Sequence, residues 1–417
     1  MDTFVIEGGR PLRGKISISG SKNAVLPIMA ATLLSADVSE IDNVPHLRDV
    51  RTMSRLLQQL GASVDISRRT IRIDTRKLHS TVAPYDLVRT MRASVLVMGP
   101  LLARFRKACV SLPGGCAIGA RPIDIHLKGF EALGASIHLD GGYVHLRIKS
   151  APKRKIRLSS ASVGATENIM MYAASLPQKT VIHNAAREPE ISDLAAFLTS
   201  AGATIRGAGS SRMEIIGSSK LGGVKHRVIP DRIESGTFAV AAALTRGDLR
   251  LTQTRPDHLS SVLDKLAEAG ARVDQDVDEV RVAAPRRPRA LTLTTMPYPG
   301  FPTDMQAQFM ALLAVGDGTS VITETVFENR YLHAAELGRM GADIAVDGRV
   351  AVIKGVKNLR GAPTTASDLR ASAALVLAGL VAEGKTVINR VYHLDRGYES
   401  MEKKLRNVGA AIARRRA

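Results

Sequence analysis

The chain has 417 residues, of which 45% are hydrophobic and 23% charged, and its formal net charge is +19. This composition is typical of a soluble globular protein with two or three domains. No apolar stretch is long enough to cross a bilayer, and the first residues do not resemble a signal peptide, so we expect a cytosolic protein without a membrane partner. The basic clusters are short and scattered and aromatic residues make up only 4% of the chain, which argues against a nucleic-acid partner.

Taken in chain order, six segments follow one plan: an amphipathic helical pattern, a Gly-Ala pair and an alternating strand pattern. The glycines of these pairs are Gly61, Gly134, Gly202, Gly270, Gly341 and Gly409, spaced 68 to 73 residues apart. Glycine commonly ends a helix at this place because it adopts the left-handed conformation at low cost. The spacing therefore predicts six repeats, each with one helix that exposes a polar face.

Each repeat also contains a second helical pattern, which is apolar on nearly all sides. These segments are residues 23–34, 91–103, 165–176, 237–245, 305–315 and 370–382. A helix without a polar face belongs inside a fold. We therefore predict an α/β (α+β) architecture in which sheets face outward around central, buried helices.

The predicted N-termini of these buried helices combine capping residues, cations and acids. The caps are Ser21, Thr303 and Ser367; the cations are Lys22, Arg92, Arg232 and Arg370; the acids are Asp86, Asp231, Asp304 and Asp368. Cations are unfavourable where the helix dipole is already positive, so either each pairs with a neighbouring acid or an anionic ligand neutralises them. No Walker loop, dinucleotide fingerprint or zinc motif is present, which argues against nucleotide hydrolysis, dinucleotide redox chemistry and a zinc site. These parts suit acid–base chemistry on a small, multiply charged anion.

The stretch "LPGGCAIGARP", residues 112–122, places Cys116 between a glycine pair and Arg121. A mobile loop with a nearby cation would favour a reactive thiolate, although a solvent-facing turn with an incidental cysteine is the alternative. The other cysteine, Cys109, lies in an apolar strand pattern, where we expect a buried, inert thiol.

Ten motifs in this chain resemble those of the UDP-N-acetylglucosamine 1-carboxyvinyltransferases, a family of enolpyruvyl transferases. They are "SGSKNAVLP", "TMRAS", "PGGCAIGARP", "SVGAT", "NAAREPEI", "DRIESGTF", "FPTDMQAQF", "ETVFENR", "SDLRAS" and "HLDRGYE". The resemblance implies a two-domain inside-out α/β barrel of six repeats, with residues 1–21 plus 230–417 in one domain and residues 22–229 in the other. It also implies transfer of the enolpyruvyl group of phosphoenolpyruvate to the 3-hydroxyl of UDP-N-acetylglucosamine, by addition and elimination and without a metal or organic cofactor. This reaction commits the sugar to peptidoglycan synthesis, and fosfomycin alkylates the family's loop cysteine.

The resemblance assigns roles to individual residues. Cys116 would protonate the methylene carbon of phosphoenolpyruvate, Asp304 would be the general base, and Asp368 would assist the proton transfers. Residues implied to bind phosphoenolpyruvate are Lys22, Arg121 and Arg396 at the phosphate, Arg330 and Arg370 at the carboxylate, and Asn23, with Lys22 and Arg396 also counted as catalytic. Residues implied to contact the UDP-sugar are Asn23, Arg92, Arg121, Pro122, Ile123, Asp124, Ile125, Ser162, Val163, Gly164, Asp304 and Val326.

Two other functions are weighed against this one. The 5-enolpyruvylshikimate 3-phosphate synthases share the six-repeat plan but do not use the loop cysteine, so Cys116 argues against that acceptor. A catalytically silent paralogue would be expected to have lost at least one of Lys22, Cys116, Asp304, Asp368 and Arg396, and all are present. Several members carry threonine after the loop cysteine; Ala117 here removes no proposed catalytic group. The sequence leaves the oligomeric state open.

Overall fold

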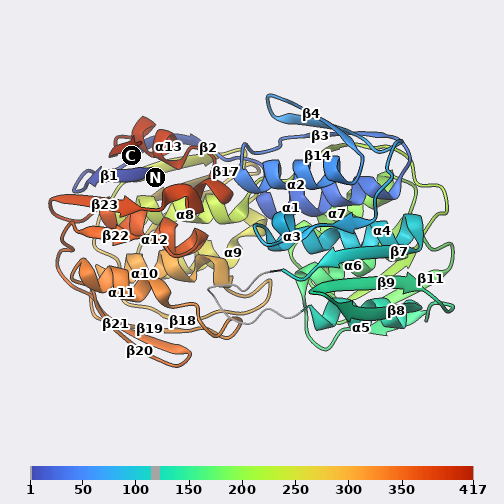
Figure 1. Ribbon diagram of the computed structural model, residues 1–417. Coiled ribbons are helices and arrows are strands. Elements are labelled where there is room, and N and C mark those ends of the chain that lie inside the picture. The colour runs from blue at the N-terminus through green and yellow to red at the C-terminus, as the bar shows by residue number, and fades with distance from the viewer. Residues whose placement is uncertain (1, 114–122, 417) are drawn as a thin grey trace. The chain divides into compact units, whose positions relative to one another are not determined.

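The structure is a computed structural model, and it describes residues 2–113 and 123–416. The described residues divide into two compact units. Unit 1 comprises residues 2–19 and 230–416, and unit 2 comprises residues 20–113 and 123–229. Across the described residues the principal strands form six four-stranded sheets, three in each unit (Figure 1).

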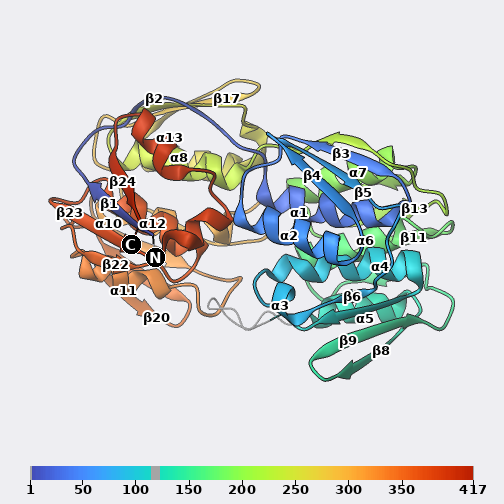
Figure 2. The same cartoon turned by 45° about the horizontal axis from the view of Figure 1, so that its top comes forward.

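The three sheets of unit 1 share one topology, and in spatial order their strands are as follows. The first is β2 (Arg13–Ser17), β15 (Asp248–Thr252), β17 (Glu279–Ala283), β16 (Arg272–Gln275). The second is β18 (Thr292–Thr294), β19 (Thr319–Thr323), β21 (Val350–Lys354), β20 (Asp343–Asp347). The third is β22 (Pro363–Thr365), β23 (Lys385–Asn389), β1 (Thr3–Glu7), β24 (Ala411–Arg415), which brings both described ends of the chain into one sheet (Figure 2).

The sheets of unit 2 repeat this topology. The first is β14 (Lys225–Arg227), β3 (Val38–Asp42), β5 (Thr70–Asp74), β4 (Ser63–Ser67). The second is β6 (Val82–Ala83), β7 (Lys107–Ser111), β9 (Tyr143–Ile148), β8 (Ala135–Asp140). The third is β10 (Lys155–Arg157), β11 (Lys179–His183), β13 (Arg212–Ile216), β12 (Thr204–Arg206). In every sheet the first two strands are parallel and the remaining pairs antiparallel.

One helix of each repeat is buried, as predicted. In unit 1 these helices are α8 (Arg232–Leu244), α10 (Gln306–Ala314) and α12 (Leu369–Gly379); in unit 2 they are α1 (Lys22–Ala31), α4 (Met98–Phe105) and α6 (Val163–Ala173). Helices α8, α10 and α12 pack on one another, and each also packs on a sheet of its own unit. Every residue of α10 is buried, and so are all residues of α12 after its first. The predicted arrangement of inner helices and outer sheets is therefore confirmed.

The second set of helices precedes the six Gly-Ala pairs. These are α2 (Arg48–Gln59), α5 (Asp124–Ala132), α7 (Pro189–Ser200), α9 (Ser260–Glu268), α11 (Leu332–Arg339) and α13 (Met401–Asn407). In α7 eight of the twelve residues are buried, and the exposed residues Ala196, Thr199 and Ser200 lie on one face, as predicted. The buried set includes Asp193, whose carboxylate accepts from the His226 ring at 2.9 Å and from the Ile229 amide at 3.3 Å. The polar side chain of Asp193 therefore has its partners inside unit 2, on the buried side of this helix.

Short helical segments complete the fold. They are α3 (Tyr85–Val88), η1 (Thr32–Leu34), η2 (Arg92–Val97), η3 (Pro256–His258), η4 (Thr303–Met305) and η5 (Val391–Arg396). Among the helices of the described residues, none is both long and apolar enough to span a membrane.

The predicted helix starts are only partly correct. Ser21 caps α1 and accepts from the Ala24 amide at 3.3 Å, as expected. Ser367 does not cap α12; Asp368 does, through bonds from the amides of Arg370 at 2.9 Å and Ala371 at 3.1 Å. Thr303 is not the cap of α10 either, because η4 precedes that helix and the Thr303 hydroxyl points to Glu324. A carboxylate is the stronger acceptor at a positively polarised helix end.

The six glycines of the Gly-Ala pairs all have positive φ, from +88° to +118°. Gly341 offers a clean test because a Cβ built there would meet nothing within 4 Å. Gly341→Ala should therefore lower the free energy of unfolding through backbone strain alone, by about 1–2 kcal/mol. Gly338, in α11, also has open space around its Cβ position and no positive φ. Gly338→Ala should stabilise the protein by about 0.4–1 kcal/mol. Urea denaturation of both variants checks this, and a shift of the same sign in both would contradict it.

Candidate active site

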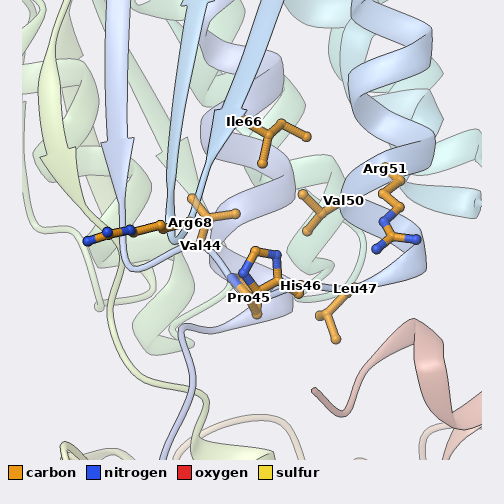
Figure 3. A pocket seen from close by; sticks show the side chains of 8 residues that line it. All are labelled: Val44, Pro45, His46, Leu47, Val50, Arg51, Ile66 and Arg68. Atoms are coloured by element: carbon orange, nitrogen blue, oxygen red, sulfur yellow. The ribbon is translucent and has the colours of Figure 1, made fainter. Parts of the chain in front are cut away.

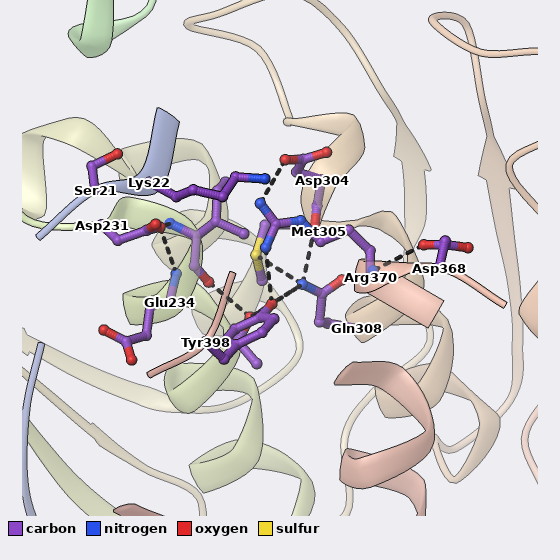
Figure 4. A network of polar contacts seen from close by, with 12 residues as sticks. Ser21, Lys22, Asp231, Glu234, Asp304, Met305, Gln308, Asp368, Arg370 and Tyr398 are labelled. Carbon is purple, nitrogen blue, oxygen red and sulfur yellow. Dashed lines mark hydrogen bonds and ion pairs between the residues drawn. The ribbon is translucent and has the colours of Figure 1, made fainter. Parts of the chain in front are cut away.

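In unit 1, the Asp304 carboxylate lies between two buried arginines. Arg330 Nη2 is 2.7 Å from Asp304 Oδ1. Arg370 Nη2 is 2.8 Å from Asp304 Oδ2, and Figure 4 shows these two side chains facing each other. Both arginine side chains are only 5% exposed. Removing a guanidinium from water is costly unless an anion compensates it. Arg370 therefore pairs with an acid 66 residues away in the chain rather than with its neighbour Asp368.

Arg370 is fixed from a second side by Tyr398. Arg370 Nη1 lies 3.2 Å from the Tyr398 hydroxyl, which also lies 2.9 Å from Thr237 Oγ1 and 3.3 Å from Gln308 Nε2 (Figure 4). Burial lowers the pKa of Arg370, but the nearby Asp304 carboxylate and other acids hold it above its usual value. Burial raises the pKa of Tyr398, which therefore remains protonated and bonded. Tyr398 was not among the predicted site residues, although it lies in the motif "HLDRGYE".

Asp368 combines a structural and an electrostatic role at the start of α12. Its carboxylate caps the helix, and its charge acts on His333 of α11, which is 1% exposed. Burial lowers the pKa of His333 to about 4, opposed by Asp368 and reinforced by Arg330. His333 is therefore an uncharged imidazole at neutral pH. No local sequence pattern indicated this residue, because the partners that define its surroundings come from other elements.

Arg396 and Val326 complete the predicted residues of unit 1. Arg396 is the last residue of η5, which packs against α12, and it is partly exposed. The Val326 amide donates to Glu324 Oε1 at 2.8 Å. The structure therefore brings Asp304, Arg330 and Arg370 into direct contact and places Arg396 on an element that touches the Arg370 helix.

In unit 2, Lys22 begins α1 beside an acid of the neighbouring helix. Lys22 Nζ is 3.8 Å from Asp49 Oδ2, and the two side chains are 14% and 4% exposed. Asn23 follows Lys22 in the first turn of α1. The Lys22 side chain is thus held near the end of its own helix by α2 rather than extending freely into water.

The other predicted residues of unit 2 lie at the beginnings of η2, α5 and α6. Arg92 starts η2; Asp124 starts α5, with Ile123 as its cap and Ile125 as its second residue; Ser162 caps α6, followed by Val163 and Gly164. Asp124 pairs with Lys128 at 3.7 Å. A Cβ on Gly164 would lie 3.1 Å from His126 Cε1, so glycine allows the imidazole to approach the α6 backbone. His126 was not predicted, although it lies two residues after Asp124.

His126 occupies a buried polar network. Its Nδ1 lies 2.9 Å from Asn168 Nδ2, so Nδ1 is the acceptor of that bond. Asn168 also donates to the Val95 carbonyl at 3.0 Å and accepts from the Gly99 amide at 2.9 Å. Burial lowers the pKa of His126 to about 3, with a further lowering by Arg92 and a smaller opposing effect of Asp124. This histidine is therefore neutral and connects α5, α6 and the η2–α4 segment.

Three predicted residues, Cys116, Arg121 and Pro122, lie outside the described residues. Cys109 does lie in a strand, β7, as expected, but it is partly exposed rather than buried. Burial still raises the pKa of the Cys109 thiol. The described residues contain no group of three or more His, Cys, Asp or Glu side chains that could hold a metal ion.

A cavity of about 230 Å³ opens in unit 2 where α2 begins (Figure 3). It is lined by Val44, Pro45, His46, Leu47, Val50, Arg51, Ile66 and Arg68. None of the residues predicted to contact a substrate is among them. The predicted substrate residues that the structure describes lie instead around the arginine–carboxylate cluster of unit 1 and at the helix starts of unit 2.

The buried His126 should make stability depend on pH. In the unfolded chain histidine takes up a proton near pH 6.5, whereas folded His126 remains neutral down to about pH 3. Unfolding between these values binds a proton, so this group's contribution to stability is present above pH 6.5 and is lost as the pH falls. His126→Gln should flatten the pH dependence of the unfolding free energy by up to about 1.4 kcal/mol per pH unit. Urea denaturation from pH 7.5 to 4.5 measures this. The exposed His145→Gln is the control, and equal slopes for wild type and His126→Gln would contradict it.

Comparisons with known proteins agree along the whole chain. The EPSP synthase family (3-phosphoshikimate 1-carboxyvinyltransferase) matches residues 6–405. A UDP-N-acetylglucosamine 1-carboxyvinyltransferase of Geobacter metallireducens is 55% identical over 99% of both chains, and one of Geotalea uraniireducens is 54% identical with the same coverage.

Two solved structures support the fold. The enolpyruvyl transferase NikO from Streptomyces tendae has a TM-score of 0.89 at 26% identity, covering 100% of this chain and 99% of that one. An EPSP synthase from Acinetobacter baumannii, at 18% identity with 100% coverage of both chains, has a TM-score of 0.76, which supports the fold alone. The chain therefore belongs to the EPSP synthase family of enolpyruvyl transferases and, within it, to the UDP-N-acetylglucosamine 1-carboxyvinyltransferases.

Proposed function

We propose that this enzyme transfers the enolpyruvyl group of phosphoenolpyruvate to the 3-hydroxyl of UDP-N-acetylglucosamine and releases phosphate. The reaction would be the first committed step of peptidoglycan synthesis, carried out in the cytoplasm and needed for cell shape and cell division. Full-length relatives of that name at 52–55% identity support this acceptor over shikimate 3-phosphate. The observation that carries the chemistry is the pair of buried arginines that hold one carboxylate.

The arginine pair suits the carboxylate of phosphoenolpyruvate. Arg330 and Arg370 each contact a different oxygen of Asp304, so together they already form a binding site for a carboxylate. Guanidinium groups are always charged and match the planar geometry of this ligand. We propose that the substrate carboxylate takes the place that Asp304 occupies in the free enzyme.

This exchange would connect substrate binding to catalysis. Both Asp304 oxygens accept hydrogen bonds from guanidiniums. The Asp304 carboxylate must therefore break its bond to at least one arginine before it can take a proton from the sugar. A substrate carboxylate compensates the same two cations, and this frees Asp304. Asp304 then accepts the 3-hydroxyl proton as the sugar oxygen attacks C2 of phosphoenolpyruvate, while Cys116 delivers a proton to the methylene carbon. Loss of a proton from the resulting methyl group and departure of phosphate from C2 restore the double bond in the product.

The remaining predicted residues are proposed to bind the other groups. Lys22, Arg121 and Arg396 would hold the phosphate of phosphoenolpyruvate, and Asn23 would also bind this substrate. Lys22 and Arg396 would stabilise charge on the departing phosphate, and Asp368 would assist the proton transfers. Asn23, Arg92, Arg121, Pro122, Ile123, Asp124, Ile125, Ser162, Val163, Gly164, Asp304 and Val326 would contact the UDP-sugar. We also propose that residues 1–21 plus 230–417 form one domain and residues 22–229 form the other.

Phosphate release from phosphoenolpyruvate in the presence of UDP-N-acetylglucosamine tests this function. We expect turnover with this acceptor and none with shikimate 3-phosphate. Asp304→Asn keeps the size of the side chain but removes the base, so kcat should fall by about 10²–10⁴-fold. The same variant should bind phosphoenolpyruvate at least as tightly as wild type in calorimetry, because it removes the competing carboxylate. Turnover near the wild-type rate in Asp304→Asn would remove Asp304 from the mechanism, and weaker binding would contradict the proposed exchange.

Fosfomycin should inactivate the enzyme by alkylating Cys116. Cys109 is the internal control within the same chain. Burial raises the Cys109 pKa, so little thiolate forms there near neutral pH and its alkylation should be slow. Peptide mapping by mass spectrometry should find the adduct on Cys116 alone, and Cys116→Ser should remove it. An adduct mainly on Cys109 would contradict the assignment.

A further inference from the structure

Glu324 is one of the buried carboxylates of unit 1, and its side chain accepts four hydrogen bonds. Glu324 follows β19 and is 1% exposed. Its Oε1 accepts from Thr295 Oγ1 at 2.9 Å and from the amides of Val326 at 2.8 Å and Phe327 at 3.1 Å. Its Oε2 accepts from Thr303 Oγ1 at 2.8 Å. Four donors on one carboxylate satisfy a charge that would otherwise be expensive to bury.

Three of these four donors belong to segments that carry proposed site residues. Thr303 immediately precedes Asp304 in η4. Val326 is itself a proposed contact of the UDP-sugar, and the Phe327 ring lies 5.3 Å from Arg330 Cζ. Glu324 therefore connects the segment of the base with the segment that leads to one of its two arginines.

We propose that Glu324, acting through Thr303, is a positioning residue for Asp304, an inference that rests on the proposed function. Helix η4 is a single turn, and its cap Pro302 makes no side-chain capping bond. The Thr303 hydroxyl holds this turn to Glu324 on one side of Asp304. On the other side, Gln308 Nε2 donates to the Asp304 carbonyl at 2.9 Å.

These two bonds do not involve Arg330 or Arg370. They therefore persist when a substrate carboxylate takes over the guanidiniums and the Asp304 side chain leaves them. A general base must lie within hydrogen-bond reach of the proton that it accepts, and a displacement of about 1 Å can cost on the order of 10²-fold in rate. The bond from Thr303 to Glu324 thus keeps the turn in place at the step when the side chain loses its arginine partners.

Three variants separate this positioning role from a general contribution to folding. Thr303→Val has nearly the same shape and removes only the hydroxyl, whereas Thr303→Ser retains it. Thr295→Val is the matched control, because it removes a hydroxyl bond to the same carboxylate from a segment without a proposed site residue. Thr295 also accepts from the Thr325 amide at 2.9 Å, so its loss should lower stability.

For Thr303→Val we expect kcat for phosphate release to fall by about tenfold or more, with KM for phosphoenolpyruvate within about twofold because the proposed anion ligands are untouched. Thr303→Ser should restore kcat to within about twofold of wild type. Thr295→Val should lower the midpoint of thermal unfolding but leave kcat unchanged. The folded fraction at the assay temperature, taken from the thermal unfolding curve, corrects kcat to the amount of folded enzyme. Wild-type kcat in Thr303→Val, or an equal loss of kcat in Thr295→Val, would overturn the positioning role. Absence of turnover in the wild type would instead overturn the proposed function, and this inference with it.

Discussion

The candidate site depends on one constraint: two arginine side chains are almost completely buried and must face an anion. In the free enzyme Asp304 is that anion, held at 2.7 and 2.8 Å by Arg330 and Arg370. Breaking a buried ion pair by removing one partner is strongly unfavourable because it leaves a charge uncompensated. A ligand that displaces Asp304 must therefore bring negative charge of its own. Under the proposed function, the carboxylate of phosphoenolpyruvate would meet this requirement.

The fold supports this cluster by burying the helices whose ends supply it. Arg370 lies in the first turn of α12, where the helix dipole opposes a cation. Asp368 offsets this effect as the helix cap, Asp304 pairs with the guanidinium, and Tyr398 binds its other nitrogen. Asp368 thus caps the start of the helix, while Asp304 and Tyr398 orient the Arg370 guanidinium. Because α12 is buried along almost its whole length, the arginine has little freedom to move away from the site.

Local sequence patterns predicted the repeats but not the partners. The six glycines and the apolar helices follow from periodicity, since helix ends and buried faces depend on residues close in the chain. The two incorrect caps have a different cause: Asp368 competes with Ser367 as an acceptor, and the Thr303 hydroxyl binds Glu324. Contacts between distant segments cannot be predicted from the spacing of residues along the chain. Such contacts determine the pairing of Arg370 with Asp304 and the surroundings of Tyr398, Glu324 and His126. Family resemblance predicted the site residues, and the structure shows the contacts of those that lie within the described residues.

Under the proposed function, the Asp304 exchange also explains how unproductive chemistry would be limited. A ligand with a phosphate but no carboxylate could occupy the phosphate ligands and still leave both Asp304 oxygens on the arginines. The sugar hydroxyl would then face no available base. Only a ligand with both groups would bind at the phosphate ligands and release Asp304 together. Substrate selection and activation of the acceptor would thus follow from the same two ion pairs. The Thr303 bond to Glu324 would hold the released Asp304 within hydrogen-bond reach of the sugar hydroxyl.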